Sequence, residues 1–128
     1  MADQVVLDSS ALMALLRGEQ GAQYVHLALG RSCISTVNIA EVQTKLVGAG
    51  LDDDSAWLHI ASAGCDTIPF DDNLARMAGS LVRVTKPFGL SLGDRACLAL
   101  AIDRKATVYT TDRIWKKLDL QIDVELIR

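Results

Sequence analysis

The sequence predicts an α/β fold in which a central parallel sheet of about five strands carries helices on both faces. Two observations lead to this prediction. Short β-branched or aromatic runs alternate with longer helical patterns, and no repeat, low-complexity segment or long linker interrupts the alternation. Because 128 residues suffice for one hydrophobic core, residues 1–128 are expected to form a single domain.

Five runs have the composition of strands. The first contains Val5-Val6-Leu7, and the fourth contains Thr107-Val108-Tyr109-Thr110. The strands are expected near residues 4–8, 32–35, 66–69, 106–110 and 123–127.

Helices are expected between these strands, and glycines mark several of their ends. The first two are predicted over residues 9–17 and 19–29, before Gly18 and Gly30. The third runs over about residues 36–47, and the fourth extends from the acidic cap at 52–55 to Gly64.

Three further helices are predicted in the second half of the chain. One begins at residues 71–72 and ends near Lys86-Pro87, because the residue before proline is disfavoured in the α region. The next begins at Ser91, and a short last helix covers about residues 112–118.

The composition bears on location and partners. The longest apolar stretch, residues 96–102, is far shorter than the roughly 20 residues that cross a bilayer, and no secretory signal opens the chain. The cysteines, Cys33, Cys65 and Cys97, form no C-x-x-C pair and are expected to be free thiols of a reducing compartment. A cytoplasmic protein without membrane contact is therefore expected.

Charge is distributed unevenly along the chain. The net charge is −3, but residues 1–75 carry −7 and residues 76–117 carry +6. The basic stretch favours either contact with a polyanion or an ordinary solvated helix face, and the charge pattern alone leaves both open.

Four acidic residues lie where an apolar segment begins or ends: Asp8, Glu41, Asp94 and Asp112. Each has a structural explanation. The three aspartates match helix caps, with Ser91 and Asp94 spaced as a capping box, and Glu41 has Lys45 four residues on for an ion pair. The carboxyl edge of a parallel sheet, however, is where ligand sites form, so all four are candidates for one pocket.

Convergence of the four acids predicts a bound cation. Two carboxylates about 4 Å apart repel by about 4 kcal/mol at an effective dielectric of 20. Oxygen ligands without His or Cys suit Mg²⁺ or Mn²⁺, which can activate water and neutralise a phosphoryl group. Metal-dependent hydrolysis of phosphodiesters is the first functional hypothesis.

With these residues the chain resembles the PIN-domain ribonucleases, and in particular the VapC-like toxins of type II toxin-antitoxin pairs. The resemblance covers nearly the whole chain, and the order and spacing of its motifs agree. Its carriers are residues 6–11 (VLDSSA), 34–42 (ISTVNIAEV), 90–101 (LSLGDRACLALA) and 108–115 (VYTTDRIW).

The resemblance implies a three-layer α/β/α fold and an endoribonuclease that cleaves RNA with Mg²⁺ or Mn²⁺. Asp8, Glu41 and Asp94 would be the main metal-binding and catalytic carboxylates, with Asp112 as the fourth, and Ser9 and Thr110 would hydrogen-bond to them. The family also implies a homodimer and a cognate VapB-like antitoxin. Arg95, beside Asp94, would pair with a phosphate or with Asp94 itself.

Alternatives from other classes fit less well. Lys86-Pro87 resembles the signature of receiver-type signalling modules, but those carry paired acids after the first strand, where Ser9-Ser10 follow Asp8 here. A dehalogenase-type phosphatase would need an aspartate at the place of Ser10. A catalytically silent PIN-like binding module also remains open, although none of the four acids is missing.

Overall fold

The computed structural model describes residues 3–128 and contains a five-stranded parallel sheet. Its strands are β1 (Val5–Leu7), β2 (Ser32–Ser35), β3 (Asp66–Ile68), β4 (Thr107–Thr110) and β5 (Val124–Leu126). They lie in the order β3-β2-β1-β4-β5, and every pair is parallel. The predicted strands and their parallel pairing are therefore confirmed.

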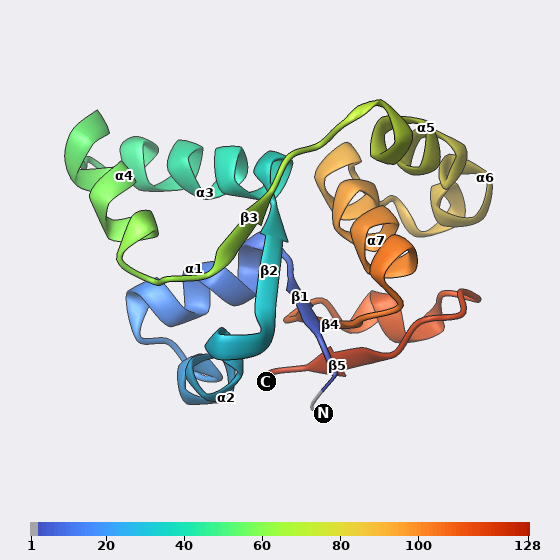
Figure 1. Ribbon diagram of the computed structural model, residues 1–128, viewed down its shortest axis with the longest axis horizontal. Helices are drawn as coiled ribbons and strands as arrows, with labels where there is room; N and C mark the ends of the chain where they lie inside the picture. Colours follow the sequence, from blue (N-terminus) through green and yellow to red (C-terminus); the bar gives the residue numbers. More distant parts are fainter. Residues whose placement is uncertain (1–2) are drawn as a thin grey trace.

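Helices cover both faces of this sheet (Figure 1). One layer contains α1 (Ser9–Arg17), α2 (Ala22–Ala28), α3 (Thr36–Gly48) and α4 (Asp53–Ala61). The other contains α5 (Asp72–Ser80), α6 (Val82–Thr85) and α7 (Leu92–Arg104). The fold is the three-layer α/β/α arrangement that was expected.

The alternation of side chains along β1 explains the two layers. Val5 and Leu7 belong to the core beneath α1 to α4, whereas Val6 belongs to the core beneath α7, and all three are fully buried. Leu98 and Leu100 make α7 apolar around much of its circumference, since it packs on both the sheet and α5.

The structure differs from the sequence prediction in three segments. The predicted helix over residues 71–86 is divided into α5 and α6, with the break following Gly79-Ser80, a pair that commonly kinks helices. Lys86 was expected to leave the helical region before Pro87, but it stays there (φ −55°, ψ −44°) and opens a 3₁₀ helix, Lys86–Phe88.

The other two differences are tighter turns. The predicted helix over residues 19–29 is shortened to α2, which is followed by the 3₁₀ helix Leu29–Arg31. The predicted helix over residues 112–118 is the 3₁₀ helix Arg113–Lys117. The apolar spacing that predicted helices does not distinguish short α from 3₁₀ turns.

The order of the strands determines where a site can form. From β1 the chain crosses to β2 on one side of the sheet, whereas from β4 it crosses to β5 on the other side. The two connections therefore diverge at the carboxyl ends of β1 and β4. Such a divergence opens a crevice at the sheet edge. Within residues 3–128 no helix is long and apolar enough to span a membrane, and the three cysteines are free.

Candidate active site

Asp8 directly follows β1 and is held by three hydrogen bonds. One carboxylate oxygen, Oδ1, accepts from the Ser10 hydroxyl (2.7 Å) and the Ala11 backbone N–H (2.8 Å). The other, Oδ2, accepts from the Thr110 hydroxyl at the end of β4 (2.5 Å). Asp8 is therefore the N-cap of α1, as the structural explanation predicted, and it also bridges to the neighbouring strand.

Burial of Asp8 makes its negative charge unfavourable. The residue is 4% exposed, and burial raises the pKa of its carboxyl from the usual 3.8 to about 6. The three hydrogen bonds oppose this rise, and the charge of Asp94 adds to it. A helix cap alone does not require a carboxylate under these conditions, because a neutral Ser or Asn caps as well.

Asp94 lies in the first turn of α7 and completes a capping box. Its Oδ2 accepts from the Ser91 backbone N–H (2.9 Å), and its own N–H donates to the Ser91 hydroxyl (3.2 Å). Burial raises the pKa of Asp94, the bonds from Ser91 oppose the rise, and the charges of Glu41 and Asp112 increase it. The charge of Asp94 therefore interacts with the charges of Glu41 and Asp112.

Glu41 lies on α3 and does not form the expected ion pair with Lys45. Across residues 3–128, the one ion pair within 4.0 Å joins Arg128 and Glu19. Instead, Glu41 Oε1 accepts from the side-chain amide of Asn38 (2.8 Å), one turn earlier in the helix. That contact points Glu41 toward α7, since the same amide also donates to the Gly93 carbonyl (3.0 Å).

Asp112 follows β4 and caps the 3₁₀ helix Arg113–Lys117 by accepting from the Ile114 N–H (3.0 Å). Its own backbone N–H donates to the Thr110 hydroxyl (3.0 Å). Thr110 therefore links Asp8 to Asp112 through its hydroxyl.

Ser9, the other residue expected to support the carboxylates, makes no side-chain hydrogen bond to Asp8 in the described residues. Ser10 supports the carboxylate instead. Its hydroxyl donates to Asp8 Oδ1 and accepts from the Thr111 N–H (3.0 Å). The side chain two residues beyond an N-cap reaches back over the helix end, which places Ser10 closer to the carboxylate. Arg95 likewise pairs with neither Asp94 nor any other described acid, and it donates to the Ala78 carbonyl of α5 (3.2 Å).

The four carboxylates could accept a hard cation. Across the described part of the chain, no hydrogen bond reaches Oε2 of Glu41, Oδ1 of Asp94 or Oδ2 of Asp112. Each of these residues keeps one oxygen available, and oxygen donors suit Mg²⁺ or Mn²⁺. Yet no three His, Cys, Asp or Glu side chains within residues 3–128 are already arranged around one point, so side-chain rotation would have to close the ligand set.

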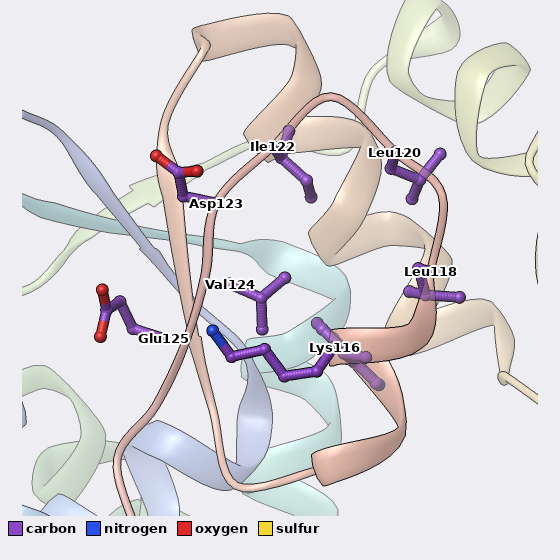
Figure 2. Close-up of a pocket in the computed structure, with 8 residues that line it drawn as sticks. Lys116, Leu118, Leu120, Ile122, Asp123, Val124 and Glu125 are labelled. Carbon is purple, nitrogen blue, oxygen red and sulfur yellow. The ribbon is translucent and has the colours of Figure 1, made fainter.

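A separate hollow of about 240 Å³ lies beside β5, away from these acids. Figure 2 shows apolar side chains such as Leu120, Ile122 and Val124 on one side, with Asp123 and Glu125 pointing away from them. Strand alternation explains the separation, since Val124 faces opposite to both acids. Lys116 extends across the hollow toward the side of Glu125 (Figure 2), and none of the four candidate acids lines it.

Two further residues, Asn38 and Gly93, shape this site and were not expected from the sequence. Asn38 is three residues before Glu41, a spacing that places both on one helix face and could have been noticed. Gly93 is noteworthy because a side chain there would overlap the carboxylate of Glu41. Nothing in the local sequence indicates that contact, because the two residues are far apart along the chain.

Comparison with solved structures supports the same architecture. A chain of the DNA-bound VapBC from Salmonella typhimurium superposes with a TM-score of 0.77 at 16% identity, covering 99% of this chain and 100% of that chain. FitAcB from Neisseria gonorrhoeae gives a TM-score of 0.68 at 23% identity, with coverage of 94% and 96%. These two similarities concern the fold.

Another structure is more similar in sequence. VapBC-5 from Mycobacterium tuberculosis, a member of the VapBC family of toxin-antitoxin systems, gives a TM-score of 0.66 at 28% identity and 99% coverage of both chains. The comparison with curated proteins gives no match. The family model of the PIN domain matches residues 5–120, and the chain therefore belongs to the PIN domain family.

Proposed function

We propose that this protein is a Mg²⁺- or Mn²⁺-dependent endoribonuclease that hydrolyses RNA phosphodiester bonds at Asp8, Glu41, Asp94 and Asp112. The observation that carries the proposal is electrostatic: Asp94 interacts with Asp8, Glu41 and Asp112, and burial and mutual repulsion raise the pKa values of Asp8 and Asp94. Carboxylates that repel one another at a sheet edge gain from a shared cation. Membership of the PIN domain family, whose members are generally nucleases, supports the reaction class.

The chain's own residues would orient the reacting groups. Asp8, Glu41, Asp94 and Asp112 would hold the cation, which would supply an activated water and neutralise charge on the phosphoryl group. Thr110 and Ser10 fix the plane of the Asp8 carboxylate, and Ser91 fixes that of Asp94. These contacts limit the movement needed to reach a productive geometry.

The charge around the site favours an RNA substrate. Arg113, Lys116 and Lys117 directly follow Asp112 and are exposed on the 3₁₀ helix Arg113–Lys117. Trp115, which is 1% exposed, anchors that helix in the core beneath α7. Cations next to a carboxylate site would attract a phosphate backbone toward it.

We further propose that the protein is a cytoplasmic, single-domain VapC-like toxin that forms a homodimer and is inhibited by a VapB-like antitoxin. The similarity to chains from VapBC complexes supports this assignment. Trp57 and Leu58 on α4, 54% and 70% exposed, offer apolar surface for a protein partner.

Incubation of the purified protein with a labelled structured RNA tests the proposed reaction. Cleavage is expected with Mg²⁺ or Mn²⁺, and chelation with EDTA should abolish it. Asp94→Asn should lower the rate at least about 100-fold, because the cation loses a ligand. Asp103→Asn, which changes an exposed acid near the other end of α7, is the matched control and should cleave normally. Equal cleavage by both variants, or cleavage that resists EDTA, would contradict the proposal.

A further inference from the structure

Asn38 joins the two helices that carry Glu41 and Asp94. It lies in the first turn of α3 and is 1% exposed. Its side-chain nitrogen, Nδ2, donates to Glu41 Oε1 (2.8 Å) and to the carbonyl of Gly93 in α7 (3.0 Å). One amide group thus connects a carboxylate on α3 to the backbone immediately before Asp94.

The orientation of this amide follows from its neighbours. Both groups facing Nδ2 are acceptors, so a rotated amide would place Oδ1 against two other oxygens. In the observed orientation Oδ1 is buried and has no hydrogen-bond partner among residues 3–128. The two donated bonds therefore determine which way the amide faces, even though Oδ1 gains no protein partner.

Gly93 provides the space in which Glu41 meets α7. A Cβ atom at position 93 would overlap the carboxylate of Glu41, so the carboxylate lies directly against the Gly93 backbone. Hydrogen bonding by Asn38 and the missing side chain at Gly93 therefore act together. Together they hold the Glu41 carboxylate against Gly93, the residue that precedes Asp94.

We propose that Asn38 is a positioning residue, which fixes Glu41 against Gly93 so that the carboxylates of Glu41 and Asp94 stay close enough to share a divalent cation. The part of this inference that concerns the cation rests on the proposed function. Groups that orient metal ligands commonly contribute 10- to 100-fold to metal affinity.

A double-mutant cycle on Mn²⁺ affinity separates positioning from general structural support. Asn38→Ala should weaken Mn²⁺ binding about tenfold, as measured by calorimetry. In a Glu41→Ala background the same substitution should change the affinity less than twofold, because no carboxylate remains to be positioned. Equal losses in both backgrounds would overturn the proposal.

A second measurement needs neither a cation nor activity. The chain has two asparagines, and Asn73 is exposed. NMR should find slow hydrogen exchange at the side-chain amide of Asn38 and fast exchange at that of Asn73, and Glu41→Ala should accelerate the exchange at Asn38 alone. Fast exchange at Asn38 in the unmodified protein would overturn the positioning role, including when Asn38→Ala does not fold. If the protein bound no Mn²⁺ while Asn38 stayed protected until Glu41 was removed, the proposed function would fail and the contact would stand.

Discussion

Asp8→Asn is expected to abolish RNA cleavage, by at least about 100-fold, and at the same time to make the metal-free protein more stable at neutral pH. The loss of activity follows from removing a negatively charged ligand of the cation. Stability rises because the buried carboxylate no longer has to be ionised. The rise of the Asp8 pKa from 3.8 to about 6 corresponds to about 3 kcal/mol of unfolding free energy.

The difference in stability between Asp8→Asn and the unmodified protein should depend on pH. The pKa of Asp8 is about 6 in the folded protein and near 3.8 in the unfolded chain, so the folded protein binds the proton more tightly. The contribution of Asp8 to stability is therefore most favourable below about pH 4 and declines as the pH rises to about 6. Asp8→Asn should be more stable than the unmodified protein above pH 6, and the difference should disappear below pH 4.

Thermal or urea unfolding in EDTA at several pH values measures this difference. Asp103→Asn, at an exposed acid, should unfold like the unmodified protein throughout. Adding Mn²⁺ should raise the melting temperature of the unmodified protein and leave Asp8→Asn unchanged. If Asp8→Asn lost stability at pH 7, Asp8 would be acting chiefly as the cap of α1.

Gly93→Ala is expected to lower RNA cleavage at least about tenfold with little change in stability. The new methyl group would overlap the carboxylate of Glu41, so this carboxylate must leave its position against Gly93. The free energy of unfolding should change little, because the displaced group is the end of a flexible side chain and alanine favours a helix over glycine by roughly 0.5–1 kcal/mol.

Gly79→Ala is the matched control, since it changes a helical glycine whose Cβ position in α5 is open. That variant should keep full activity and gain slightly in stability. Steady-state cleavage rates and urea unfolding of both variants provide the comparison. Normal cleavage by Gly93→Ala would show that the position of Glu41 against α7 is not needed for the reaction.

Local sequence patterns were sufficient to predict the strands and most helices. The β-branched residues around Val6 and Val108 identified two central strands, and the Ser91 capping box identified the start of α7. The patterns failed where 3₁₀ turns replace expected α-helical turns, as at Leu29–Arg31 and Arg113–Lys117. Weak differences between α and 3₁₀ hydrogen bonding do not appear as a change in residue type.

The candidate site was also predictable only in part. Asp8, Asp94 and Asp112 follow strands or open helices, and their capping bonds are local in the chain. The orientation of Glu41 instead depends on Gly93, 52 residues further along, and the sequence offered Lys45 as a nearer partner. Contacts between residues far apart in the chain determine the orientation of Glu41, and one sequence alone does not reveal them.

Soaking crystals of the protein in Mn²⁺ and measuring anomalous scattering at the manganese edge tests the proposed metal site most directly. The expected result is a peak among the four carboxylates, with Asp8 and Asp94 oxygens at ligand distances of about 2.0–2.2 Å and Glu41 or Asp112 bound directly or through water. No peak at saturating Mn²⁺, or a peak only at another acidic group such as Asp52-Asp53-Asp54, would contradict a shared cation at this sheet edge.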